Sequence, residues 1–250
     1  MAARVRWKGA SGALSILGWL ALIPALLLTA FLWVAQDGAL YGRIQDRYVT
    51  EASTGIRDEA RYALNADLAA FLRGERDRLD RVVTVFGNTR TAFWPDEQSH
   101  MDDVRNLFEL ARNVRWYLSL WGILLVSAAV ALTRKDWVAC LRHGYLKALA
   151  VWGIALLVLV AWAASDFNQA FLMFHGMLFN NQLWIMNPDT DLMIRMLPEA
   201  FFRDIALYAL GAMLAALALV MLVLLPWKNW MRALRLRNQE LERREALDDD

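Results

Sequence analysis

The sequence predicts an all-α membrane protein with four transmembrane helices and a helical extracytoplasmic insert between spans one and two. Of the 250 residues, 58% are hydrophobic, whereas soluble domains are typically about half apolar. The excess is concentrated in four long apolar runs, and a helix needs about 20 apolar residues to cross a bilayer core. Backbone groups in lipid must be satisfied internally, so these runs are expected to be helices.

The four apolar runs divide the chain into segments. We expect spans over residues 13–35, 116–133, 148–164 and 205–227. The segments that connect or follow them are the insert 36–115, the loops 134–147 and 165–204, and the tail 228–250.

Basic residues predict the orientation of these spans. Short cytoplasmic loops carry an excess of lysine and arginine. Such residues occur before the first span, between the second and third spans, and after the fourth: Arg4, Arg6, Lys8, Arg134, Lys135, Arg142, Lys147, Lys228, Arg232, Arg235 and Arg237. Both termini are therefore expected in the cytoplasm, with the insert and the 165–204 loop on the outer face.

The insert shows mostly helical signals. Residues 56–72 place apolar side chains at mixed spacings of three and four, and Gly74 is a plausible stop. We expect a second helical run over 78–86. A third is expected to begin at Ser99 as N-cap and to continue into the second span without a break.

Composition removes several classes of function. The formal net charge of +1 argues against nucleic acid as the main partner. Cys140 is the single cysteine, so no intramolecular disulfide can form. The sequence has no Gly-x-Ser-x-Gly elbow, P-loop or dinucleotide fingerprint, and no histidine pair has a strong metal-binding spacing.

The candidates for chemistry are histidines. His143 lies in the basic cytoplasmic loop and is expected to be a solvated loop residue. His100 and His175 fall on the outer side, His100 near Glu97 and Asp103, and His175 in an aromatic segment too polar to cross the bilayer. Such a segment lies at the interface or lines a protein-walled cavity.

Two outer histidines with nearby carboxylates indicate general acid–base work on a lipid or lipid-linked substrate. A histidine among aromatic rings at membrane depth is costly to charge and so is expected to be neutral. The alternatives are structural: an interfacial His175 hydrogen-bonded to its loop, and a His100 exposed in a first helical turn.

The two outer segments carry a resemblance to a known family. The motifs are FHGMLFNN (174–181), Trp184, DTDLMI (189–194), LPEAFF (197–202) and EQSHMDDV (97–104). Together with the four-span layout, they resemble the lipoprotein intramolecular transacylase family of bacterial membrane proteins. Residues 36–95 carry no matching motif.

The resemblance implies an acyltransferase in the bacterial cell membrane whose active site lies on the extracytoplasmic face. Its partners would be diacylglyceryl-modified lipoproteins and membrane lipid. The enzyme would move the sn-2 acyl chain of the diacylglyceryl group to the α-amine of the N-terminal cysteine, which gives the lyso form. We expect a monomer with no cofactor and no metal.

The residues suggest roles in this reaction. A neutral imidazole can take a proton from the attacking amine and pass it to the leaving glyceryl oxygen. We expect His175 to be the principal base and His100 its partner, although the roles could be exchanged. Asp103 or Glu97 is expected to orient His100.

The other expected site residues contact the substrate. Asn180, Asn181 and Trp184 could offer hydrogen bonds to the ester oxyanion, although loop hydrogen bonding explains the asparagines equally well. Substrate contacts are expected from Trp184, Phe174, Phe179 and Arg195. Arg195 could instead form a salt bridge with Asp189 or Asp191.

Two other classes of function remain open at this point. One is a non-enzymatic membrane subunit or scaffold whose outer helical cap binds a partner. The other is a metal-dependent membrane hydrolase.

Overall fold

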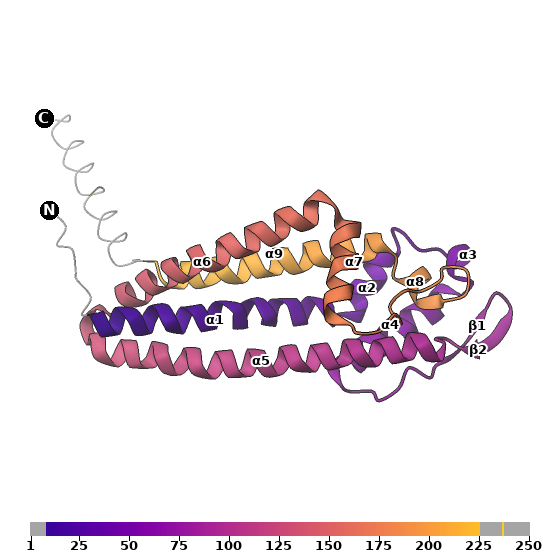
Figure 1. Ribbon diagram of the computed structural model, residues 1–250, viewed down its shortest axis with the longest axis horizontal. Helices are drawn as coiled ribbons and strands as arrows, with labels where there is room; N and C mark the ends of the chain where they lie inside the picture. The colour runs from indigo at the N-terminus through magenta and orange to yellow at the C-terminus, as the bar shows by residue number, and fades with distance from the viewer. Residues whose placement is uncertain (1–8, 226–236, 238–250) are drawn as a thin grey trace, which may run out of the picture.

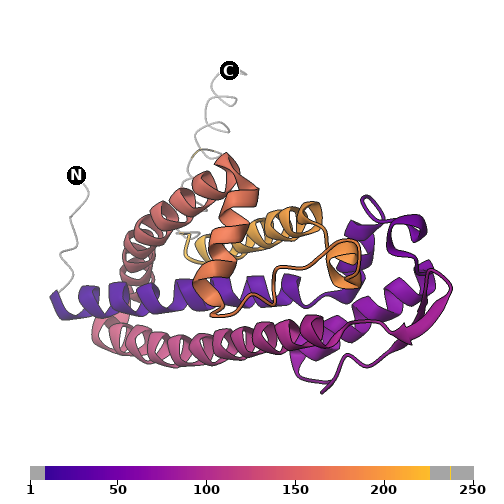
Figure 2. The same cartoon turned by 45° about the vertical axis from the view of Figure 1, so that its right-hand side comes forward.

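Four long helices lie side by side in the computed structural model, which describes residues 9–225 and 237. They are α1 (Gly9–Ala35), α5 (Pro95–Thr133), α6 (Trp137–Ser165) and α9 (Glu199–Val223). Helix α1 packs against each of the other three, and α5 also packs against α6 (Figures 1 and 2). The predicted mainly helical membrane architecture is therefore present.

Three stretches of the described chain are long and apolar enough to cross a membrane: Gly9–Ala35, Pro95–Ser165 and Glu199–Val223. The middle stretch has 71 residues. It contains α5, the short 3₁₀ turn η1 (Arg134–Asp136) and α6, which turn back on each other at η1 (Figure 1). Residues 226 and 227, the predicted end of the fourth span, lie outside the described chain.

Small residues let α1 approach its neighbours closely. A Cβ on Gly122 of α5 would lie 2.5 Å from Leu22 Cγ, and a Cβ on Gly144 of α6 would lie 2.1 Å from Ser15 Oγ. Ser15 Oγ also donates to the carbonyl of Cys140 at 3.1 Å. Small side chains at such contacts are typical of helix packing in membranes, where close van der Waals contact replaces the hydrophobic drive.

Most of the segment between α1 and α5 folds as a cap at one end of the bundle (Figure 1). It contains α2 (Gly38–Gln45), α3 (Glu51–Thr54) and α4 (Asp58–Arg73), followed by a two-stranded antiparallel sheet, β1 (Val82–Val85) and β2 (Asn88–Thr91). The core of the cap includes Leu64, Leu68 and Phe71 of α4 together with Leu192 and Met196. The expected helix over 56–72 therefore forms as α4, and it ends at Gly74, whose φ is +80°.

The prediction of a helix over residues 78–86 is wrong. Residues 82–85 (VVTV) form β1 and pair with β2 across a two-residue turn, Phe86-Gly87. Both turn residues have positive φ, +47° and +83°, which suits the twist of a tight hairpin. Three β-branched valines in four residues favour this extended strand over a helix.

The predicted start of the long helix at Ser99 is also wrong, because α5 begins four residues earlier. Pro95 stands at the first helical position, where a missing N–H costs nothing. The Glu97 carboxylate accepts a hydrogen bond from the Trp94 N–H at 2.7 Å, which caps the helix start. From there α5 continues unbroken for 39 residues, as the absence of a helix breaker predicted.

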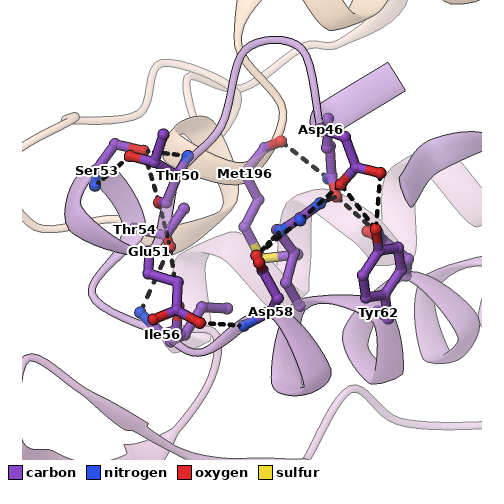
Figure 3. A network of polar contacts seen from close by, with 12 residues as sticks. Asp46, Thr50, Glu51, Ser53, Thr54, Ile56, Asp58, Tyr62 and Met196 are labelled. Atoms are coloured by element: carbon purple, nitrogen blue, oxygen red, sulfur yellow. Dashed lines mark hydrogen bonds and ion pairs between the residues drawn. The ribbon is translucent and has the colours of Figure 1, made fainter. Parts of the chain in front are cut away.

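A buried polar network ties the cap to the segment before α9. Gln45 Nε2 donates to the Met196 carbonyl at 2.9 Å, while Gln45 Oε1 accepts from Arg61 and Asn65. Arg61, only 2% exposed, also forms ion pairs with Asp46 and Asp58 at 2.8 Å each. Figure 3 shows Asp46, Asp58 and Met196 within this network of dashed contacts. The buried charge of Arg61 depends on these partners, because a buried charge left unpaired is strongly destabilising.

The second outer segment is more ordered than a plain interfacial loop. It contains α7 (Phe167–Leu178), which runs across the long helices in Figures 1 and 2, and the short α8 (Leu192–Met196), which packs into the cap. Asp166 starts α7 by accepting the Gln169 N–H at 2.9 Å. The loop after α7 lies against the beginning of α5, where Asn181 Nδ2 donates to Asp103 Oδ2 at 2.8 Å.

Candidate active site

His100 lies in the second turn of α5, where the helix start is clamped by Glu97. Its side chain is buried, with 7% of the residue exposed, and its ring meets Phe179 edge-on at 5.0 Å between centroids. Within the described chain, His100 Nδ1 is buried without a hydrogen-bond partner. A buried polar atom left in this condition is costly in a native structure and is characteristic of functional sites.

His175 lies in α7, one turn after Phe171. Its Nδ1 is 2.8 Å from the Phe171 carbonyl oxygen. A carbonyl can only accept a hydrogen bond, so Nδ1 carries the proton and the lone pair of the neutral ring belongs to Nε2. The helix backbone thus sets the tautomer that a general base needs.

The two histidines, which sequence reasoning proposed as one site, lie close together. Their ring centroids are 6.1 Å apart, with the rings tilted by 34°. Phe179 packs against both rings, at 5.0 Å from His100 and 5.6 Å from His175. The pair is therefore brought together by α5, α7 and the first residue after α7.

Aromatic side chains surround His175. Centroid separations from its ring are 4.1 Å to Phe171, 5.2 Å to Trp184, 5.5 Å to Phe174 and 5.6 Å to Phe179. Phe171 in turn packs on Phe202 of α9 at 5.1 Å. Phe174 itself is 53% exposed, so an apolar surface continues outward from the histidine.

This environment keeps both imidazoles neutral near pH 7. Burial, with a smaller contribution from neighbouring His175, lowers the pKa of His100 to about 4, although Asp103 acts in the opposite direction. Burial also lowers the pKa of His175, against the hydrogen bond with the Phe171 carbonyl. Neutral rings can accept protons, which is the state required of a general base.

A chain of hydrogen bonds joins α5 to the loop after α7. Asn181 Nδ2 donates to Asp103 Oδ2 at 2.8 Å, and Trp184 Nε1 donates to the Asn181 carbonyl at 3.0 Å. Asp103 is thus placed between the His100 helix and the loop that carries Trp184. Asn180, the neighbouring candidate, is exposed.

Glu97 occupies a different position from the one expected of an orienting carboxylate. It is 1% exposed, and its two oxygens accept from the backbone N–H groups of Trp94 and Met193, each at 2.7 Å. Burial raises the pKa of Glu97, and the two backbone hydrogen bonds lower it by less. These contacts make Glu97 a clamp between the start of α5 and α8, and leave Asp103 as the carboxylate nearer to acting on His100.

Within the described residues, Arg195 forms neither of the salt bridges considered for it, with Asp189 or with Asp191. Its Nε donates to the backbone carbonyl of Asp191 at 3.1 Å, and its guanidinium lies over the Phe86 ring at 5.3 Å. Arg195 therefore connects α8 to the hairpin turn, a contact with a residue of the unmatched insert.

The remaining sequence candidates lie elsewhere. His143 and Cys140 are both in the first two turns of α6, at the opposite end of the bundle from the outer cap; Cys140 is buried, and its Sγ lies 3.5 Å from the Ser11 carbonyl oxygen. Sequence reasoning missed Phe171 and Phe202; the spacing of four between Phe171 and His175 was the available signal for the first. Within the described residues, no group of three or more His, Cys, Asp or Glu side chains could hold a metal ion.

Comparisons with known proteins agree with this geometry. The family model described as lipoprotein intramolecular transacylase Lit matches residues 15–202. No curated protein sequence matches the chain.

Among solved structures, the chain is similar to the membrane integral lipoprotein intramolecular transacylase Lit from Bacillus cereus, with 17% identity, a TM-score of 0.69, and coverage of 90% of this chain and 98% of the other. Two variants of that protein also match. One has a His→Arg substitution (17% identity, TM-score 0.67, 91% and 94% coverage), and the other has a His→Ala substitution (18%, 0.68, 90% and 96%). These likenesses show a shared fold.

The family model covers well over half of the chain, and it includes both histidines and the segments around them. The chain therefore belongs to the lipoprotein intramolecular transacylase Lit family of membrane acyltransferases.

Proposed function

We propose that the protein catalyses intramolecular acyl transfer in bacterial lipoproteins. It moves the sn-2 acyl chain of the diacylglyceryl group to the α-amine of the N-terminal cysteine, which yields the lyso form. The observation that carries this proposal is a pair of neutral histidines, the buried His100 and the half-buried His175, whose ring centroids are 6.1 Å apart among aromatic rings in a member of this family.

The first half of the reaction requires a base. An α-amine has a pKa of roughly 8, so part of it is protonated at neutral pH and must lose a proton to attack an ester. His175 is suited to this step because its Nδ1–H is held by the Phe171 carbonyl, which leaves Nε2 free to accept. A general base of this kind typically contributes about 10²–10⁴ to the rate.

The second half returns the proton. As the new N–C bond forms and the ester C–O bond breaks, the glyceryl oxygen leaves and takes up the proton that the amine released. We assign to His100 the relay of that proton or a hydrogen bond to the leaving oxygen, which is supported by the 6.1 Å separation of its ring from that of His175. Atoms balance without an outside acyl donor or cofactor.

Binding residues complete the proposed site. Asp103 accepts a hydrogen bond from Asn181 and so holds the loop after α7 beside the helix that carries His100. Asn181 has one further amide N–H beyond its bond to Asp103, and exposed Asn180 lies beside it, so either could meet the ester oxyanion. The indole N–H of Trp184 is already bonded to Asn181, which favours an apolar contact with substrate through its ring, next to Phe174 and Phe179.

Proximity supplies much of the remaining acceleration. The amine and the ester belong to one molecule. Holding two such groups in a well-oriented contact can correspond to an effective molarity of about 10⁵ M or more. Apolar rings around His175 would exclude water, which limits competing ester hydrolysis. A monomer is sufficient for this chemistry.

We further propose that α1, α5, α6 and α9 each cross the membrane once, with both termini in the cytoplasm. This topology is supported by the turn at η1, which lets α5 and α6 run in opposite directions, and by the basic residues near that turn. It puts the histidine site at the outer leaflet, where lipoprotein acyl chains lie.

Mass spectrometry of a lipoprotein N-terminus tests the proposal in cells that depend on this enzyme for lyso-form synthesis. His175→Ala and His100→Ala should each abolish conversion of the diacyl to the lyso form, whereas His143→Ala should not. Full conversion in both His175→Ala and His100→Ala would contradict the proposal and favour a scaffold role. Activity that disappears with chelator and returns with stoichiometric metal would favour a metal-dependent hydrolase instead.

A further inference from the structure

A cavity lies on a different face of the bundle from the histidines, between α2 and the ends of α1 and α9 that are next to it. Its volume is about 640 Å³. We call it the α1–α9 groove. Helix α2 contacts α9 at the end of the bundle where α9 begins (Figure 1).

The outer rim of the groove carries two positive and two negative side chains. Arg43 and Arg47 lie one helical turn apart, in α2 and just after it, and Asp37 and Asp204 complete the rim. Arg43 lies 3.7 Å from Asp37 with 65% of its side chain exposed, and Arg47 lies 2.8 Å from nearly buried Asp204. Asp37 Oδ1 accepts the backbone N–H groups of Ala39 and Leu40 as the N-cap of α2, so Oδ2 is the oxygen that faces Arg43. The Arg43–Asp37 ion pair is long and exposed, so Arg43 and Asp37 Oδ2 remain open to other partners.

The inner part of the groove is apolar and has small residues on α9. Gly211 and Ala215 form its floor, and Trp33, Leu207 and Tyr208 flank it. A Cβ built on Gly211 would meet nothing within 4 Å. From Asp204 to Ala215 the helix rises by roughly 16 Å, which is comparable with the length of an extended acyl chain.

The groove lies on the opposite side of α9 from the histidines. Phe202 faces the histidine site through Phe171, at 5.1 Å between ring centroids. Gly211 follows Phe202 by nine positions, and at 100° per residue this places the two on opposite faces of α9. A ligand in the groove would therefore be separate from a substrate at His175.

We propose that the α1–α9 groove binds one glycerophospholipid with a zwitterionic head, an acyl chain lying over Gly211 and the phosphate at Arg43 and Arg47. Guanidinium groups form strong hydrogen bonds with phosphate oxygens. The ammonium of an ethanolamine head would meet Asp37, so the balanced rim charges complement both halves of the head. Asp204 is already held by Arg47 and by the Tyr48 hydroxyl, so a head with a phosphate and no ammonium would leave Asp37 facing an anion.

Native mass spectrometry of the purified full chain in detergent tests this site. Three lipids with identical acyl chains are added separately: phosphatidylethanolamine, phosphatidylglycerol and diacylglycerol. The expected result is one retained phosphatidylethanolamine and about tenfold weaker retention of phosphatidylglycerol, the effect of losing one charge-assisted interaction. Diacylglycerol, which lacks both charged groups, should be retained still more weakly. Equal retention of phosphatidylethanolamine and phosphatidylglycerol by the wild type would overturn the headgroup assignment.

Variants locate the bound lipid. Gly211→Leu should place its side chain in the groove, because a Cβ at Gly211 meets nothing within 4 Å, and Gly153→Leu in α6 is its control because a Cβ there also meets nothing within 4 Å. Arg43→Gln should weaken phosphatidylethanolamine binding about tenfold, and Gly211→Leu should abolish it, whereas Gly153→Leu and His100→Gln should leave it unchanged. Undiminished binding in Gly211→Leu, or binding lost in His100→Gln, would overturn the site while leaving the transacylase proposal unaffected.

Discussion

Glu97 offers a quantitative test of how the active-site loop is held. It is 1% exposed, and each oxygen accepts one backbone N–H at 2.7 Å, from Trp94 at the start of α5 and from Met193 in α8. Glu97→Ala would leave the buried Met193 N–H and the partly buried Trp94 N–H without an acceptor. A buried unpaired donor costs about 1–3 kcal/mol and a partly buried one costs less, so the unfolding free energy should fall by about 2–4 kcal/mol.

The unfolding free energy of the amide variant Glu97→Gln should lie between those of the wild type and Glu97→Ala. Glu97→Gln keeps one acceptor oxygen and turns an NH₂ toward the other N–H, so a loss of about 1–3 kcal/mol is expected. Unfolding in mixed micelles titrated with a denaturing detergent measures both values, and Asp96→Ala, an exposed neighbour, is the control. Transacylation should decline in the same order, because Met193 anchors the far end of the loop that carries Asn181 and Trp184.

One outcome would refute this reasoning. If Glu97→Ala lost transacylation while its unfolding free energy stayed within about 0.5 kcal/mol of the wild type, as for a surface substitution, Glu97 would act in the chemistry rather than as a clamp.

Three further predictions follow from contacts described above. Gly144→Val should lower the unfolding free energy by about 1–3 kcal/mol because its Cβ would lie 2.1 Å from Ser15 Oγ, and Gly153→Val, at an open position, should not; melting in detergent compares them. Because the pKa of His100 is about 4 in the folded protein and roughly 6.5 when unfolded, the native state should lose stability as pH falls from about 6.5 toward 4; melting temperatures of His100→Gln should vary less across that window, and an identical acid profile would contradict the burial argument. Asp103→Asn should slow transacylation about tenfold with little change in melting temperature, since it weakens the hydrogen bond to Asn181; an unchanged initial rate would remove Asp103 from the site.

Local signals in the sequence were sufficient for the long helices and for the candidate histidines. Apolar length marks a membrane helix without reference to the rest of the chain. His100 and His175 were paired through the predicted topology and the family motifs, and the structure brings their rings to 6.1 Å. The roles assigned to these histidines remain predictions.

The misplaced elements show where local signals compete. In residues 78–86, the run that ends before Gly87 suggested a helix, but the β-branched residues before Phe86-Gly87 form a strand. At the start of α5, Ser99 was a plausible cap, but Pro95 and the carboxylate of Glu97 supplied a better one.

Other features depend on contacts that are distant in the chain. Glu97 meets Met193, and Arg195 lies over Phe86, so neither position could be deduced from sequence spacing. The assignment of Nε2 as the basic nitrogen of His175 likewise required the geometry of the Phe171 carbonyl.

The most direct test of the central claim follows the acyl chain itself in a crossover experiment. Purified protein receives a mixture of two diacylglyceryl lipopeptides that differ in peptide mass, only one of which has an isotope-labelled sn-2 chain. Mass spectrometry should find the label only on the α-amine of the peptide that brought it, and no transfer with His175→Ala. Label on the other peptide's amine would contradict intramolecular transfer, and unchanged product from His175→Ala would contradict histidine catalysis.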